Sequence, residues 1–166
     1  MSYVDTSIIV LALDPLDPRS DNAKKRLEMN EYKIVSELVL AELSSVIARR
    51  KEMLNELGKE LKADETKLAY AIVLYILRRF NLIYRPLSSL RPSFPSLGKV
   101  YKPILLAIEL STLLRLKTLD LMHIAYIKAL KEEGEPISVL LTGDKDFKNA
   151  ELQLMKNLKI KVELVS

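Results

Sequence analysis

Residues 3–13 read Tyr-Val-Asp-Thr-Ser-Ile-Ile-Val-Leu-Ala-Leu, and this stretch decides the predicted fold class. Two apolar residues, a polar break and a second apolar run predict a short buried strand that ends at Asp5. The strand is expected to pass directly into a helix capped by Thr6 or Ser7, because short hydroxyl side chains favour the N-terminus of a helix. Asp5 would therefore lie at the carboxyl end of a strand.

Strands and helices alternate along the rest of the chain. Apolar runs predict strands at 32–35, 82–87, 138–141 and 160–165 and helices at 19–29, 36–50, 64–80, 103–114 and 118–133. A loop is expected over 88–99, where Pro92, Pro95 and Gly98 interrupt regular structure. Alternating strands and helices favour a parallel sheet covered on both faces. The sequence predicts a three-layer α/β/α fold with a central parallel sheet of about four to five strands.

Length and composition limit the class of protein. With 166 residues, the chain is expected to form a single domain over residues 1–166. Its residues are 49% hydrophobic and 29% charged, which is typical of a globular protein. The absence of cysteine and the presence of one histidine exclude disulfides, thiolate metal sites and multi-histidine metal sites.

Charge and hydropathy indicate where the protein acts. The longest apolar run, over 68–77, has about half the length that a membrane-spanning helix needs. The first ten residues lack the basic region of a signal peptide, so we expect a cytoplasmic protein without a membrane partner. The net charge of +4 favours a polyanionic partner such as nucleic acid.

Five acidic residues occur in structural contexts that favour a shared site. Asp5 follows the first strand, and Asp144 and Asp146 follow the strand at 138–141. Glu42 lies among apolar residues of a helix, and Asp120 lies at a helix start. The carboxyl ends of parallel strands meet at one sheet edge, and converging carboxylates bind hard cations. With one histidine and no thiolate, the expected ion is Mg²⁺ or Mn²⁺.

Such an ion orients a water, lowers its pKa and stabilises charge on a phosphodiester, so the predicted chemistry is phosphodiester hydrolysis. Each acid also has a structural interpretation, because Asp120 and Asp144 suit helix N-termini and Asp5 suits a turn. Glu42 is more informative, since an unpaired carboxylate in a half-buried position is costly. His123 lies one turn after Asp120, and we expect a packed, hydrogen-bonded residue rather than a ligand.

Four segments resemble those of the PIN-domain ribonucleases, especially the VapC-type toxins of prokaryotic toxin–antitoxin pairs. They are Tyr-Val-Asp-Thr-Ser at 3–7, Ser-Glu-Leu-Val-Leu-Ala-Glu-Leu at 36–43, Leu-Asp-Leu-Met-His-Ile-Ala at 119–125 and Leu-Thr-Gly-Asp-Lys-Asp-Phe at 141–147. Each segment is short, but their order makes the combination specific. The resemblance implies that the catalytic and metal-binding residues are Asp5, Glu42, Asp120 and Asp144. It implies Asp146 as an auxiliary metal ligand, and Thr6 and Thr142 as substrate or support residues.

The resemblance also implies a function. It implies a Mg²⁺- or Mn²⁺-dependent endoribonuclease that acts as the toxin of a type II pair, with RNA and a cognate antitoxin as partners and a homodimeric assembly. The chain departs from the family pattern by extra helical length around 58–114, which leaves the toxin role and the RNA target open. The alternatives are a housekeeping RNA-processing PIN nuclease and a catalytically inactive PIN-fold module that binds RNA or protein.

Two other classes use acids after parallel strands, and the residues disfavour both. An aspartate-nucleophile phosphatase needs a second Asp two positions after the first, where this chain has Ser7. A phosphotransfer receiver needs a phosphoacceptor Asp after a central strand, and the strand at 82–87 offers none.

Overall fold

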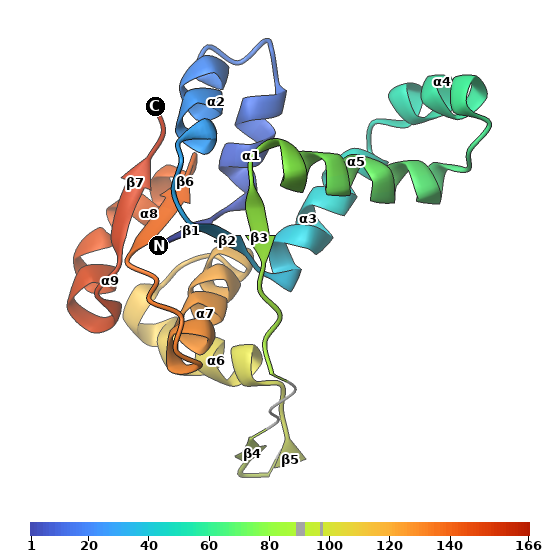
Figure 1. The fold of residues 1–166 in the computed structure, drawn as a ribbon. Helices are drawn as coiled ribbons and strands as arrows, with labels where there is room; N and C mark the ends of the chain where they lie inside the picture. The colour runs from blue at the N-terminus through green and yellow to red at the C-terminus, as the bar shows by residue number, and fades with distance from the viewer. Residues whose placement is uncertain (89–91, 97) are drawn as a thin grey trace.

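A central sheet of five parallel strands organises the computed structural model, which describes residues 1–88, 92–96 and 98–166 (Figure 1). The strand order is β3-β2-β1-β6-β7. The strands are β1 (Ser2–Val4), β2 (Lys33–Val35), β3 (Leu82–Tyr84), β6 (Val139–Thr142) and β7 (Lys161–Leu164). This sheet, with helices packed around it, confirms the predicted three-layer α/β/α fold.

The first strand occupies the centre of the sheet. Tyr3 lies opposite Ile34 of β2 on one side and opposite Leu140 of β6 on the other. A parallel strand with neighbours on both sides and helices on both faces is buried along its length. Tyr3 and Val4 accordingly have no exposed surface. The central position of β1 brings Asp5 to the middle of the carboxyl edge.

Helices connect the strands and cover the sheet. They are α1 (Thr6–Leu13), α2 (Ser20–Glu28), α3 (Glu37–Ala48), α4 (Lys51–Leu61), α5 (Glu65–Arg79), α6 (Lys102–Leu114), α7 (Thr118–Glu132), α8 (Lys145–Asn149) and α9 (Glu151–Leu158). Helix α1 packs against α2 and α3, while α6 packs against α7. Figure 1 shows α4 and the adjoining part of α5 extending away from the sheet. Within the described ranges, no helix is both long enough and apolar enough to span a bilayer.

Two helices, α5 and α8, begin at an aspartate whose side chain accepts a hydrogen bond from the first turn. Asp64 caps α5 at the start of the helix predicted over 64–80, since its carboxylate accepts a hydrogen bond from the Lys67 amide at 2.9 Å. The prediction that Thr6 or Ser7 caps α1 was wrong, because the N-cap residue is Asp5. The Thr6 and Ser7 hydroxyls instead donate hydrogen bonds to the carboxylates of Glu42 and Asp5. These hydroxyls therefore orient the two carboxylates at the carboxyl edge of the sheet.

The connection between β3 and α6 differs from the prediction. Strand β3 ends at Tyr84 instead of reaching residue 87. Within the predicted loop at 88–99, residues 89–91 and 97 lie outside the described residues. The described part contains a two-stranded antiparallel hairpin formed by β4 (Ser93–Phe94) and β5 (Gly98–Lys99). Gly98 has φ +74°, a conformation that a glycine adopts without strain.

Candidate active site

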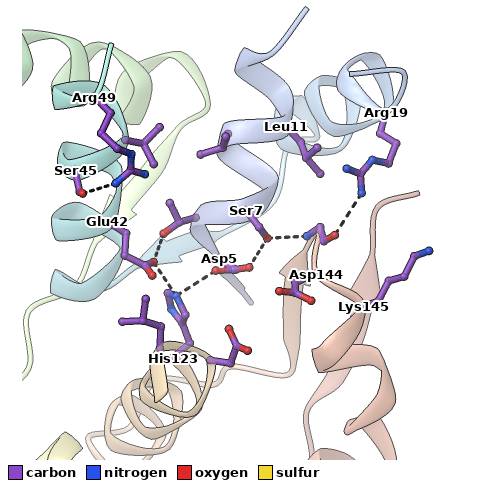
Figure 2. Close-up of a pocket in the computed structure, with 16 residues that line it drawn as sticks. Asp5, Ser7, Leu11, Arg19, Glu42, Ser45, Arg49, His123, Asp144 and Lys145 are labelled. Atoms are coloured by element: carbon purple, nitrogen blue, oxygen red, sulfur yellow. Dashed lines mark hydrogen bonds and ion pairs between the residues drawn. The ribbon is translucent and has the colours of Figure 1, made fainter. Parts of the chain in front are cut away.

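A cleft of about 720 Å³ opens at the carboxyl edge of the sheet (Figure 2). Four of the five predicted acids line it: Asp5, Glu42, Asp120 and Asp144. They come from the ends of β1 and β6 and from helices α3 and α7. The fifth, Asp146, lies next to the cleft but does not line it. The structure thus brings together residues that are up to 139 positions apart in the sequence.

Asp5 is held in one orientation by hydroxyl groups. Only 4% of its surface is exposed. Its Oδ2 accepts a hydrogen bond from Thr142 Oγ1 at 2.7 Å and another from the Ser7 hydroxyl. Its Oδ1 lies 3.2 Å from His123 Nε2. Because both oxygens have partners, the carboxylate is oriented before any ligand binds.

Glu42 faces Asp5 across the cleft. Its Oε2 accepts hydrogen bonds from Thr6 Oγ1 at 2.5 Å and from His123 Nε2 at 2.9 Å. Burial acts to raise the pKa of Glu42, but the hydrogen bonds from His123 and Thr6 outweigh burial and hold the pKa below its usual value. Glu42 is therefore an anion throughout the neutral pH range.

His123 lies between these two carboxylates and is 2% exposed. Burial acts to lower its pKa, but the hydrogen bond to Glu42 and the negative charges of Asp5 and Glu42 raise the pKa above the usual value. On the other side of the ring, Nδ1 lies 2.9 Å from the Tyr3 hydroxyl, which is 2.7 Å from Ser36 Oγ. The histidine is packed and hydrogen-bonded, as the sequence predicted, and its raised pKa favours the protonated form beside the two carboxylates.

Asp120 has the least compensated charge in the cleft. Burial raises its pKa to about 6, with further contributions from the negative charges of Asp144 and Asp5. Its Oδ2 is buried and has no hydrogen-bond partner among the residues that the structure describes. A buried carboxylate oxygen without a partner is costly, and a bound cation relieves that cost.

The acids form two groups in which the candidate ligand atoms lie within 4.8 Å of one another. The first group is Asp5, Glu42 and His123, and the second is Asp120, Asp144 and Asp146. In the second group, Asp144 Oδ1 accepts a hydrogen bond from the Asp146 amide at 2.8 Å. Asp146 Oδ2 lies 2.6 Å from Lys117 Nζ. The second group offers only carboxylate oxygens, the ligands that Mg²⁺ and Mn²⁺ favour.

The two predicted support residues occupy different places. Thr6 lines the cleft and holds Glu42. Thr142 has no exposed surface, so it orients Asp5 without reaching a ligand in the cleft. Sequence reasoning missed Ser7, which donates to Asp5 and whose oxygen accepts a hydrogen bond from the Gly143 amide at 2.9 Å. The position of Ser7, two residues after Asp5 in the sequence, was the feature that could have indicated this contact.

Three basic side chains line the same cleft. Two of them are Arg49 and Lys145. Arg49 Nη1 donates a hydrogen bond to Ser45 Oγ at 2.8 Å. Sequence reasoning did not identify Arg19, which reaches the Gly143 carbonyl at 3.5 Å and pairs with Asp17. Its proximity to the cleft depends on the packing of α2, so no local pattern indicates it.

These features define a class: a parallel α/β protein with a carboxylate-lined cleft suited to hard cations at the end of its central strands. The sequence profile of the PIN domain matches residues 2–152. The chain belongs to the PIN domain family. The comparison with curated proteins gave no match.

Solved structures of VapC proteins have a similar fold. VapBC2 from Rickettsia felis, bound to a promoter DNA fragment, aligns with a TM-score of 0.57 and 19% identity over 100% of both chains. VapC20 from Mycobacterium tuberculosis, described as a Sarcin-Ricin loop cleaving toxin, has a TM-score of 0.54 and 18% identity over 90% of this chain and 95% of its own. VapBC-1 from nontypeable Haemophilus influenzae has a TM-score of 0.53 and 15% identity over 99% of this chain and 98% of its own.

Proposed function

We propose that this protein is a Mg²⁺- or Mn²⁺-dependent endoribonuclease that hydrolyses RNA phosphodiester bonds as the toxin of a type II toxin–antitoxin pair. The observation that carries the proposal is the buried Asp120 Oδ2, which has no partner in the part of the chain that the structure describes and lies near Asp5 and Asp144 in an open cleft. Membership of the PIN domain family and the fold shared with VapC20 support the same assignment.

The acids fit a hard divalent cation. Asp5, Glu42, Asp120 and Asp144, with Asp146 as an auxiliary ligand, would hold one or two such ions, since their ligand atoms form two neighbouring groups. When bound, such an ion lowers the pKa of a water and stabilises negative charge on the phosphate. These roles rest on the carboxylate chemistry and on the grouping of the ligand atoms.

Neighbouring side chains prepare the site for the reaction. Ser7 and Thr142 orient Asp5, and His123 holds Glu42 in place. Positioning the reacting groups in advance lowers the entropic part of the barrier. The basic side chains that line the cleft provide positive charge for the phosphates on either side of the scissile bond.

Asp120→Asn is the sharpest test of the nuclease proposal. It replaces an anionic oxygen with an amide of nearly the same size, so we expect RNA cleavage in Mg²⁺ or Mn²⁺ to be abolished while the fold is retained. Asp21→Asn is the matched control, because its side chain is 83% exposed on α2. Asp5→Asn should also abolish cleavage, but it disturbs two hydroxyl contacts and needs a check of folding. Undiminished turnover in both active-site variants would rule out the assignment.

The proposed assembly is a homodimer that binds an antitoxin. Complexes of the VapBC type among the similar structures support an antitoxin partner. Exposed Tyr70, Leu74 and Tyr75 on α5 support association between copies of the chain. Light scattering at micromolar concentration tests the dimer, and a monomer would contradict it. Growth arrest that is relieved by co-expression of a small neighbouring reading frame would distinguish a toxin from an RNA-processing enzyme.

A further inference from the structure

A second groove, of about 590 Å³, lies between the α6–α7 connection and helices α8 and α9. Its polar lining consists of Thr112, Arg115, Lys117, Asp146, Asn149 and Gln153. We propose that this groove binds the nucleotide adjacent to the scissile phosphate, with the amides of Asn149 and Gln153 contacting the base and Arg115 contacting its phosphate. The proposal rests on the nuclease function and names the part of the substrate that determines specificity.

Asp146 connects this groove with the acid cleft. Its carboxylate is within 4.8 Å of ligand atoms of Asp120 and Asp144, which line the cleft, and Asp146 also lines the groove. If the scissile phosphate of an RNA strand lies at the acids, a neighbouring nucleotide of that RNA is therefore placed at the groove. The groove volume falls within the range of about 300–1,000 Å³ that is typical of small-ligand sites.

The two amides are presented together on one side of the groove. Asn149 lies three residues after Asp146, and Gln153 lies four residues after Asn149, a spacing that places all three on one helical face. Helices α8 and α9 are separated only by Ala150, whose φ of −88° and ψ of 0° keep the chain close to helical. Both amides are exposed. An amide presents a donor and an acceptor together, which is the pattern that a base edge requires.

Charge and apolar surface complete the complementarity to a nucleotide. Lys117 is paired with Asp146, which leaves Arg115 as the positive charge in the groove. Arginine suits a phosphate because its planar guanidinium donates two parallel hydrogen bonds. Leu113, which is 44% exposed, provides an apolar wall for the face of a base. Base edges are free for such contacts only in unpaired RNA, so the expected substrate is single-stranded at this position.

The test compares binding and cleavage in groove variants. Affinities of single-stranded RNA hexamers of varied sequence are measured by fluorescence anisotropy in Mg²⁺, with Asp120→Asn in every protein to prevent turnover. Adding Asn149→Ala and Gln153→Ala together should weaken the preferred hexamer about tenfold and remove the base preference. Adding Arg115→Ala should weaken all hexamers alike and lower the salt slope by about one. Asn55→Ala, on α4, is the matched amide control and should change neither quantity.

Cleavage-site profiles of the same groove variants, now with Asp120 intact, separate the two proposals. If the wild type cleaves RNA and the amide variants keep its base preference and affinity, the groove assignment is wrong and the nuclease assignment stands. If the wild type cleaves no RNA but the amide variants still lose hexamer affinity, the groove binds a nucleotide and the nuclease assignment falls. Absence of both cleavage and groove-dependent binding overturns both.

Discussion

Asp120→Asn should stabilise the metal-free protein at pH 7.5, although the residue lies in the proposed active site. The pKa of Asp120 is raised from 3.8 to about 6, first by burial and then by the charges of Asp144 and Asp5. A difference of about two pKa units corresponds to about 3 kcal/mol between the two protonation states. Because the cleft is open to solvent, screening reduces this to about 1–2 kcal/mol. The neutral amide of Asn removes that cost.

The direction of the pH dependence follows from the raised pKa. The folded state holds the Asp120 proton more tightly than the unfolded state, so stability falls as pH rises between the unfolded and folded pKa values. The wild type should therefore lose about 1–2 kcal/mol relative to Asp120→Asn between about pH 4 and pH 6, and the difference should stay constant above that range. Titrating groups that do not interact with Asp120 contribute equally to both proteins and cancel in the comparison.

Urea unfolding in EDTA at pH 5 and pH 7.5 provides the measurement. At pH 7.5 the variant should gain stability, and its thermal midpoint should rise by roughly 2–4 °C per kcal/mol. Asp21→Asn, on the exposed surface of α2, should match the wild type within about 0.5 kcal/mol. Added Mn²⁺ should stabilise the wild type more than Asp120→Asn, because binding to the folded state adds to its stability. A variant that is less stable than the wild type in EDTA at pH 7.5 would refute this reasoning.

Two further variants test the buried network behind the acids. Tyr3→Phe removes the hydroxyl between Ser36 and His123 and should cost about 1–2 kcal/mol of unfolding free energy, measured with urea at pH 7. A loss below about 0.5 kcal/mol would show that these hydrogen bonds do not stabilise the fold. His123→Ala leaves the carboxylates of Asp5 and Glu42 without their partner and should cost about 3–5 kcal/mol of unfolding free energy in the same assay. Arg78→Ala, at an exposed residue, is the control. A cost of His123→Ala no larger than that of the control would show that the ion pairs do not contribute.

The sheet and most of the site followed from local patterns. Short apolar runs between helical segments indicated parallel strands, and residues that follow parallel strands meet at one edge. That rule was sufficient to bring Asp5 and Asp144 into one cleft. The apolar surroundings of Glu42 indicated a partly buried carboxylate with a partner, and the structure supplies Thr6 and His123 as the partners.

Features that depend on tertiary packing could not be predicted. The contact between His123 and Glu42 joins residues 81 positions apart and depends on how α3 and α7 approach each other at the sheet edge. Similarly, the Ser7 hydroxyl had two available roles, a helix cap or an Asp5 partner, and only the position of β6 decides between them. Helices α8 and α9 were missed because each is short and has few apolar residues facing the core.

The partners of the clustered acids explain why Asp120 differs from the others in its effect on stability. Five carboxylates at this sheet edge repel one another, and the fold offsets part of this repulsion internally. His123 contacts the carboxylates of Asp5 and Glu42, while Lys117 pairs with Asp146. Asp120 retains a buried oxygen without a partner among the described residues. The fold therefore leaves an uncompensated electrostatic cost at a position where a divalent ion would relieve it, as expected of a site that trades stability for function.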